Sequence, residues 1–418
     1  MFNSSLNFIE KIKRTFFPFY KNKELRFIFK KLEEGHDKEI VVARFVGGCV
    51  RKYLSGEKID DIDVATILSP DQIKERLKNT DIKIIDTGIK HGTVTVISNN
   101  LKVELTTLRK DIKTDGRHAE IEYTDDWQLD SERRDFTINA IYLDINGKIF
   151  DPQMGTIDLK NKNVKFIGDP QKRIEEDYLR IIRFIRFKIM YDVNVEKTTS
   201  EAIKQNLNGI KKISKERILV ELLKILDLEN FLKINGSGHL KEIFLMIFPE
   251  FLYLDRLERL KKICKYHNIN KEILLAVLLI DNQYNDEYFS HKYNVSKKIK
   301  ENLNKLSKLS EEAKNKSFFE KDLFKNIYLY GKDHLIVLNI IKFSINPKIK
   351  IEEFSKALNK VLKSNVPKLH IDGDFLKKNG MKEGESLGKV LKKIESEWVN
   401  NDFKISNEKV KDLIKIYS

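Results

Sequence analysis

Hydrophobic and polar positions follow one period in the first part of this chain and another in the rest. Between about residues 40 and 165, the stretches IVVARFV, GTVTVIS and LKVELTTLR are rich in β-branched residues, with continuous or alternating apolar positions, which is typical of strands. Helical patterns lie between them, such as SPDQIKERLKN with its Ser-Pro entry. This mixture predicts an α/β head, with a mixed sheet and helices.

After KFIGDP the strand signal is lost and helical periodicity takes over. A single long helix is predicted over 171–191, and segments such as SKERILVELLKILDL and KEILLAVLLID continue the pattern. We therefore predict an all-α neck, body and tail behind the head. The expected parts are a helical N-terminal extension at 1–37, the head at 38–168, the neck at 169–230, and the body and tail at 231–418.

The composition agrees with a cytoplasmic protein that has an anionic partner. The 418 residues carry a net charge of +15, which points to nucleic acid as the partner. The chain is rich in Lys, Ile and Asn, however, and a compositionally biased genome would produce the same excess of positive charge. Cys49 and Cys264 form no C-x-x-C pair, so neither a disulfide framework nor a cysteine zinc site is expected. Residues 1–20 lack the apolar core of a signal peptide, and no stretch is long enough to cross a membrane.

The stretch KIDDIDVATI places carboxylates inside an apolar run. In a strand, Asp61 and Asp63 would face the same side, about 6.6 Å apart at a rise of about 3.3 Å per residue. Like charges so placed repel each other, and a divalent cation would turn that repulsion into binding. The alternative is an edge strand with a solvated polar face.

Two neighbouring features give this pair a chemical context. In FVGGCVRKYL, Gly47 and Gly48 form a turn whose N–H groups can cradle phosphate, with Arg51 on the first helical turn. In KVELTTLR, Glu104 is a third acid in a strand; if that strand pairs beside the aspartates, the three can hold two Mg²⁺ ions. Each feature alone also fits a plain turn or a surface glutamate.

Two further stretches combine charged, amide and apolar side chains. SERRDFTINAIYLD suits phosphate and ribose contacts, or a charged helix start with a buried amide. EEDYLRIIRFIRF has arginines at every third position among bulky apolar residues, so some need anionic partners unless they form a solvated face or internal ion pairs. The polar residues are Arg133, Arg134, Asp135 and Asn139 in the first stretch, and Asp177, Arg180, Arg183 and Arg186 in the second.

In their order and separation these four stretches resemble the class II tRNA nucleotidyltransferase/poly(A) polymerase family, and the chain looks most like a bacterial CCA-adding enzyme. The motifs G-G-x-V-R, D-x-D, R-R-D-x-x-x-N-A and E-D-x-x-R are legible between about residues 40 and 190. The resemblance implies an enzyme that adds CMP, CMP and AMP from CTP and ATP to the tRNA 3′ end, releasing pyrophosphate without a nucleic-acid template. It also implies Mg²⁺ as the cofactor, a base-reading neck, and a body and tail that bind tRNA.

The resemblance assigns roles to the matching positions. Asp61 and Asp63 would hold the metal, and Glu104 would be a third catalytic acid that helps to activate the 3′ hydroxyl. Nucleotide contacts would come from Gly47, Gly48, Arg51, Arg134, Asp135, Asn139, Asp177, Arg180, Arg183 and Arg186. Lys52 departs from the family, which usually has Asp at that place, and this alters the expected contacts at the helix start.

The implied base contacts also follow from hydrogen-bond chemistry. A carboxylate such as that of Asp177 accepts from the N4 amino group of cytosine or the N6 amino group of adenine. Arg180 can donate to the neighbouring ring nitrogen of either base. Uracil and guanine place a carbonyl oxygen opposite the carboxylate, which leaves acceptors unpaired. One helix could thus accept CTP and ATP and reject UTP and GTP.

The segment LRKDIKTDGRHAEIEY separates the activities of the family. Its Arg109, Asp111, Asp115 and Arg117 resemble the flexible loop of CCA-adding enzymes, which helps to switch from C to A addition. This favours complete CCA addition over a poly(A) polymerase or a partial CC- or A-adding enzyme. Outside the family, a small-molecule nucleotidyltransferase would not need the arginine helix, and an RNA-binding protein without catalysis would not need the acids.

Overall fold

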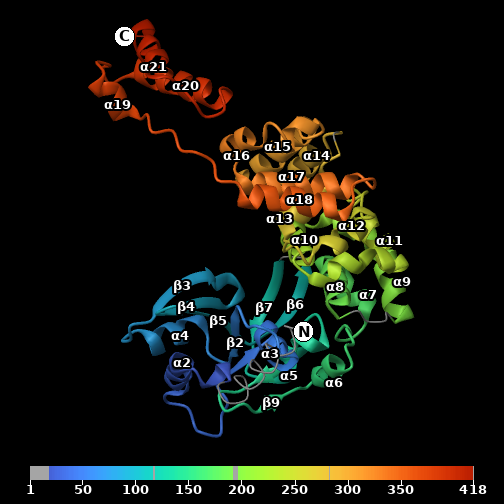
Figure 1. The fold of residues 1–418 in the computed structure, drawn as a ribbon. Helices are drawn as coiled ribbons and strands as arrows, with labels where there is room; N and C mark the ends of the chain where they lie inside the picture. The colour runs from blue at the N-terminus through green and yellow to red at the C-terminus, as the bar shows by residue number, and fades with distance from the viewer. Residues whose placement is uncertain (1–17, 116–117, 192–195, 282, 418) are drawn as a thin grey trace. The chain divides into compact units, whose positions relative to one another are not determined.

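The computed structural model describes residues 18–115, 118–191, 196–281 and 283–417, except for the side chains of 111–120 and 417 (Figure 1). By its internal contacts the chain divides into two compact units. The first comprises Met1–Phe231 and Glu242–Ile247, and the second comprises Leu232–Lys241 and Phe248–Ser418. Each unit has a hydrophobic core of its own.

A seven-stranded mixed sheet forms the head (Figure 1). Its order is β3-β4-β5-β2-β1-β8-β9, and β2 pairs with β5 in parallel, whereas the other neighbours are antiparallel. The strands are β1 (Ala43–Val46), β2 (Ile62–Thr66), β3 (Lys83–Gly88), β4 (Thr93–Ser98), β5 (Leu101–Thr107), β8 (Tyr142–Leu143) and β9 (Ile149–Phe150). A separate hairpin consists of β6 (Arg109–Asp115) and β7 (His118–Tyr123).

Alternation along the strands separates the face of this sheet that packs on the main core from a second face, which carries a smaller buried cluster around Val46, Ala65 and Tyr142. Val64 and Leu105 point into the core, where they pack with residues of α2 and α4. Asp63 and Glu104 occupy the intervening positions and therefore lie on the opposite face. The helices of the head are α2 (Lys23–Glu33), α3 (Gly48–Ser55), α4 (Pro70–Leu77), α5 (Trp127–Glu132) and α6 (Gly155–Lys160).

The prediction of a single helix over 171–191 is wrong in one respect, because the helix is interrupted at Asp177. There the backbone is extended, with φ −155° and ψ 104°, and Oδ1 of Asp177 accepts from the N–H of Leu179 over 3.1 Å. This local bond has the geometry of an Asx turn and competes with helix continuation. The helices that follow the head are α7 (Pro170–Glu176), α8 (Leu179–Tyr191), α9 (Lys197–Asn206), α10 (Lys215–Leu226) and α11 (Gly238–Ile247).

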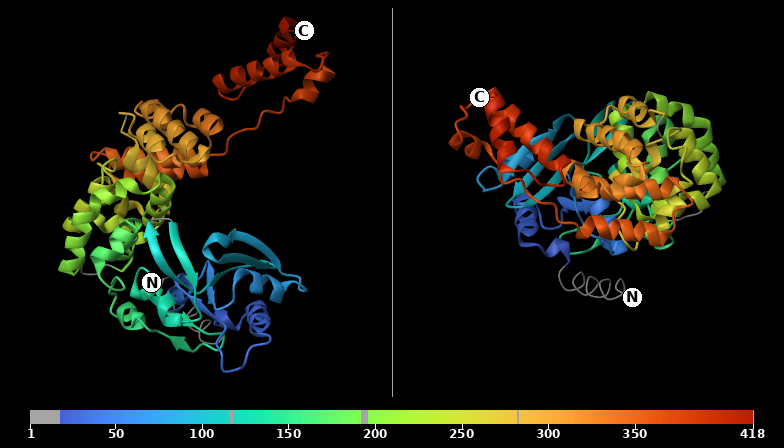
Figure 2. Two further views of the ribbon diagram at one scale, coloured as in Figure 1. Left: turned by 180° about the vertical axis from the view of Figure 1, so that it is seen from behind. Right: turned by 45° about the horizontal axis from the view of Figure 1, so that its top comes forward.

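In its described part the second unit consists of helices and the segments that connect them, without strands. The last three helices pack around Leu376, Val390 and Ile394 (Figure 2). The helices are α12 (Arg256–Ile263), α13 (Lys271–Leu279), α14 (Asn285–Lys292), α15 (Lys297–Glu312), α16 (Leu323–Tyr330), α17 (Lys332–Ile345), α18 (Ile351–Lys363), α19 (Gly373–Lys378), α20 (Glu385–Asn400) and α21 (Asn407–Tyr417). The predicted fold class, an α/β head followed by helices, is confirmed.

Short 3₁₀ helices complete the described chain: Phe19–Lys21, Ile89–His91, Thr137–Asn139, Leu207–Lys212, Glu229–Gly236 and Lys316–Phe319. Of the helical extension expected at 1–37, residues 1–17 lie outside the described part. Within the described ranges, none of the helices combines the length and the apolar character needed to cross a membrane.

Candidate active site

The turn between β1 and α3 lies directly beside one of the acids. Gly47 has φ +73°, a left-handed conformation that favours glycine, and a Cβ there would stand 3.8 Å from Oδ2 of Asp63. A Cβ at Gly48 would meet nothing within 4 Å, so space is open at the first turn of α3. A helix N-terminus attracts anions. Because the carboxylate of Asp63 lies beside this one and would repel an anion, an anion would bind best together with a cation.

Parallel pairing of β2 and β5 brings acids together. Asp63 is the register partner of Glu104, and Asp61 lies just before β2. Burial raises the pKa of the Asp63 carboxyl, the charges of Glu104 and Asp61 raise it further, and Arg134 opposes them. Oε1 of Glu104 lies 3.0 Å from Nζ of Lys102 in an exposed ion pair. The head thus places like charges close together on the face of the sheet opposite the main core.

A cavity of about 990 Å³ in the first unit collects most of the predicted site residues. Its lining includes Gly47, Gly48, Arg51, Asp61, Asp63, Arg109, Arg134, Asp135, Asn139, Asp177, Arg180, Arg183 and Arg186. Within the described part of the chain, Glu104 is not among the lining residues. The side chains of Asp111 and Asp115, and all of Arg117, lie outside the described residues. Residues from the head and from the helices behind it therefore share one cavity.

Two hydrogen bonds and an ion pair link α3 to α8. Nη1 of Arg51 donates to Oδ1 of Asn139, whose Nδ2 donates to Oδ1 of Asp135 over 2.9 Å. Nη2 of Arg183 lies 2.9 Å from the other carboxylate oxygen of Asp135. Burial disfavours the charged form of Asp135, but Arg183, Asn139 and Arg180 outweigh it and hold its pKa below the usual value. These side chains therefore hold one another in place.

Charged side chains of α7, α8 and α10, and of Asp177 between α7 and α8, form ion pairs with one another. In the single helix predicted over 171–191, Asp177 and Arg180 would be neighbours three residues apart; in the structure each side chain holds another partner. Nη1 of Arg180 lies 2.5 Å from Oε2 of Glu176, and Nη2 of Arg217 lies 2.6 Å from Oδ2 of Asp177. Arg217 belongs to α10 and also lines the cavity. Sequence reasoning missed it, although the charged positions of SKERILVELLKILDL recur at helical spacing, which is the signal that could have found it.

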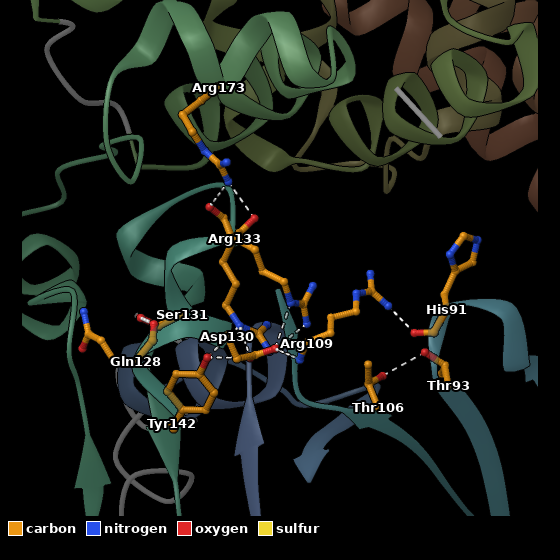
Figure 3. Close-up of polar contacts among 11 residues, drawn as sticks. His91, Thr93, Thr106, Arg109, Gln128, Asp130, Ser131, Arg133, Tyr142 and Arg173 are labelled. Carbon is orange, nitrogen blue, oxygen red and sulfur yellow. Dashed lines mark hydrogen bonds and ion pairs between the residues drawn. The ribbon is translucent and has the colours of Figure 1, made fainter. Parts of the chain in front are cut away.

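Two further contacts join α8 to α10 and α7 to the head. Nε of Arg186 lies 3.0 Å from Oε2 of Glu221, one helical turn beyond Arg217 on α10. Arg173 of α7 donates to the backbone carbonyls of Arg133 and Arg134, each over 2.6 Å (Figure 3). The second contact ties α7 to the end of α5, and so joins two walls of the cavity.

The acids suit a divalent cation that arrives with further ligands. In the described ranges, no group of three or more His, Cys, Asp and Glu side chains is placed to hold a metal ion alone. Asp61 and Asp63 both line the cavity, and a cation there would oppose the causes that raise the pKa of Asp63. Mg²⁺ is commonly held by one or two carboxylates, with waters and substrate phosphates as its other ligands. The residues therefore fit a cation shared with a phosphate-bearing substrate.

A glycine turn at a helix start, neighbouring carboxylates and a cavity lined by arginines fit the chemistry of nucleotidyl transfer. Comparison with known proteins agrees with this chemistry. The family described as "Poly A polymerase head domain" matches residues 43–165, and "Probable RNA and SrmB- binding site of polymerase A" matches residues 192–234.

Relatives match nearly the whole chain. It is 31% identical over 413 residues to "CCA tRNA nucleotidyltransferase 1, mitochondrial" of Danio rerio, covering 93% of this chain and 92% of the relative. It is 33% identical over 411 residues to the CCA-adding enzyme of Staphylococcus haemolyticus, covering 93% and 97%. The chain belongs to the tRNA nucleotidyltransferase/poly(A) polymerase family, as its motifs predicted. The structure of the Bacillus stearothermophilus CCA-adding enzyme in complex with CTP has the same fold, with a TM-score of 0.66, 22% identity, and coverage of 93% and 95%.

Proposed function

We propose that this chain is a CCA-adding tRNA nucleotidyltransferase, which adds CMP, CMP and AMP to the 3′ end of tRNA from CTP and ATP without a nucleic-acid template. The observation that carries the proposal is the one cavity lined both by Asp61 and Asp63 and by Asp177 and Arg180. The first pair suits nucleotidyl transfer, and the second suits recognition of a base. Relatives named for CCA addition match 93% of this chain and support the proposal.

The reaction forms one phosphorus–oxygen bond and breaks another. The 3′ oxygen of the RNA attacks the α-phosphorus of the nucleotide, its proton passes to a base, and pyrophosphate leaves. Asp61 and Asp63 would hold Mg²⁺, which when bound neutralises phosphate charge and favours the attack. Glu104, beside Asp63 in register, would assist removal of the proton from the hydroxyl.

Binding of the triphosphate would fall to the glycine turn and nearby arginines. The start of α3 adjoins Asp63, so phosphates bound there would share the cation. Arg51 lines the same space, and Arg134 is close enough to Asp63 to lower its pKa. Asp135 and Asn139, joined by a hydrogen bond of 2.9 Å, would then shape the ribose side.

Asp177 and Arg180 would select the base. Arg217 holds one oxygen of Asp177 at 2.6 Å, and Glu176 holds Arg180 at 2.5 Å, so a neighbour orients each side chain before a base arrives. Arg183 and Arg186 follow on α8 at intervals of three residues and would support this helix and the nucleotide. Recognition would then need fixed side chains only, and no template strand.

The proposal includes a loop like that of CCA-adding enzymes within residues 109–117. Arg109, at the start of β6, lines the cavity and would belong to the loop that serves the change from C to A addition. Asp111, Asp115 and Arg117 are proposed for the same loop on the resemblance of their sequence.

The proposed parts of the chain remain the extension at 1–37, the catalytic head at 38–168, the neck at 169–230, and the body and tail at 231–418. The last part would hold the tRNA backbone through its lysines, so affinity for tRNA should fall steeply as salt rises. A cytoplasmic location is supported by the free thiols of Cys49 and Cys264, which suit a reducing compartment.

Extension of a tRNA that ends at its discriminator base tests the proposal. We expect growth by two nucleotides with CTP alone, and by a third only when ATP is added. A long adenosine tail with ATP alone would make the protein a poly(A) polymerase, and a stop after two cytidines would make it a CC-adding enzyme. Transfer to a small alcohol but not to tRNA would place it outside RNA processing.

A further inference from the structure

The carboxylate of Asp130 lies at the centre of a buried polar cluster (Figure 3). Asp130 belongs to α5, and its exposed fraction is 0%. Nε and Nη2 of Arg133 lie 2.8 and 2.7 Å from its Oδ1, and Nη2 of Arg134 lies 3.0 Å from its Oδ2. The hydroxyl of Tyr142 donates to the same Oδ2 over 2.7 Å. One acid therefore holds two guanidinium groups at once.

Charge and packing make this arrangement firm. Burial alone would raise the pKa of Asp130, but Arg134 and Arg133 outweigh it and hold that pKa well below its usual range. Nε of Arg134 also donates to the hydroxyl oxygen of Tyr142 over 3.0 Å, and its Cζ lies 5.2 Å from the centre of the tyrosine ring. Charge-assisted bonds of this kind are shorter and stronger than neutral ones and fix a guanidinium plane.

The two arginines reach the cavity, whereas their shared partner does not. Arg133 and Arg134 line it together with Asp63, and Asp130 is not among the lining residues of the described chain. Each guanidinium turns its Nε–Nη2 edge toward Asp130, so the opposite edge is directed away from that carboxylate. Two guanidinium groups against one carboxylate leave an excess positive charge, which a phosphate would neutralise.

We propose that Asp130 is a positioning residue for the triphosphate, which fixes Arg133 and Arg134 so that their outer N–H groups meet phosphate oxygens. The proposal rests on the function proposed above. Without Asp130 the two guanidinium groups would repel each other and adopt other rotamers, and nucleotide binding would have to order them. Because the base takes no part, CTP and ATP should be affected alike.

The variant Asp130→Asn isolates the charge. The amide has the same size, and its oxygen can still accept from the backbone N–H of Arg109, which lies 3.4 Å away at the start of β6. We expect the affinity for CTP and for ATP to fall about tenfold or more, and the affinity for CMP to fall far less. Isothermal titration of the full-length enzyme with each nucleotide in Mg²⁺ measures this, and KM should rise more than kcat falls.

Two further variants separate positioning from a general loss of stability. Asp158 is a buried acid of the same unit that accepts from Oγ1 of Thr137 over 2.7 Å, so Asp158→Asn should lower Tm and leave the ratio of CTP to CMP affinity unchanged. Tyr142→Phe removes the hydrogen bond that Tyr142 donates to Asp130 and the one that it accepts from Arg134. This variant should lower the ratio of CTP to CMP affinity by about two- to fivefold. It also tests the proposal if Asp130→Asn does not fold.

The outcomes distinguish this proposal from the proposed function. A wild-type ratio of CTP to CMP affinity in the folded variants at Asp130 and Tyr142, which includes an equal loss of affinity for CTP and for CMP, would overturn the positioning role. If the wild-type enzyme extends tRNA while the ratio stays unchanged in these variants, only the positioning role fails. If the wild-type enzyme neither binds CTP nor extends tRNA, the proposed function fails.

Discussion

The two sides of the cavity carry their charges in different ways. On the head side Arg133 and Arg134 are paired with Asp130, but the acids near Asp63 are like charges, and burial and then the charges of Glu104 and Asp61 raise the pKa of Asp63. On the side of the neck helices opposite charges are paired over 2.5–3.0 Å. The pairs are Arg180 with Glu176, Arg183 with Asp135, Arg186 with Glu221, and Asp177 with Arg217.

This contrast suggests a division of roles. A side held by ion pairs keeps its shape without a ligand, which suits the selection of a base by fixed side chains. A side with neighbouring like charges gains stability when a cation binds, which suits phosphate chemistry. Changes on the head side should therefore affect transfer, and changes on the neck side should affect the choice of nucleotide.

The largest effect is expected for Asp63→Asn, which removes one carboxylate of the head side. Because the cation would lose a ligand, kcat should fall at least about a hundredfold, while the dissociation constant for tRNA should stay within about twofold. Single-turnover extension and filter binding measure the two quantities. Asp71→Asn, an exposed acid on α4, is the matched control, and turnover retained in Asp63→Asn would contradict the metal role.

A smaller effect is expected for Arg180→Ala on the neck side. Loss of the guanidinium removes a donor to the base, so the preference for CTP over UTP should fall about tenfold or more, with incorporation of CMP still measurable. Competition between CTP and UTP in primer extension gives the ratio. Lys172→Ala, at an exposed position of α7, should leave the preference unchanged, and an unchanged preference in Arg180→Ala would refute its role in base reading.

Arg217→Gln should weaken the preference for CTP over UTP by only about three- to fivefold. Asp177 keeps its carboxylate in this variant and loses the partner that orients it at 2.6 Å. A double-mutant cycle with Asp177→Asn should show that the two losses are not additive. Lys215→Gln, exposed on the same helix, is the control, and additive losses would show that the ion pair does not act on the base.

The smallest effect concerns stability. At a Mg²⁺ concentration ten times its dissociation constant, the head side should gain about 1.4 kcal/mol, seen as a rise in Tm over EDTA. The rise should disappear in the double variant of Asp61→Asn and Asp63→Asn, and persist in Asp177→Asn. If Asp177→Asn removed it as well, the two sides would not be separate in their response to cations.

Much of the site follows from patterns that are local in sequence. The glycine turn at Gly47 and Gly48, the alternation that turns Asp63 away from Val64, and the change to helical periodicity depend only on neighbouring residues. The break at Asp177 escaped the same reasoning, because the apolar period continues across it. There a single carboxylate bonds to the N–H of Leu179 and outweighs the pattern.

The class of fold and the residue types on each side of a strand or helix could be predicted from short-range periodicity, and the family from four motifs that are each local in sequence. The partner of each charged side chain depends on the tertiary structure. Glu104 is the register partner of Asp63, Arg217 pairs with Asp177, and Asp130 pairs with two arginines. Strand order and helix packing are set by burial of the whole apolar surface, which no short stretch of sequence contains. Those partners decide which charges are paired and which are left to bind a ligand.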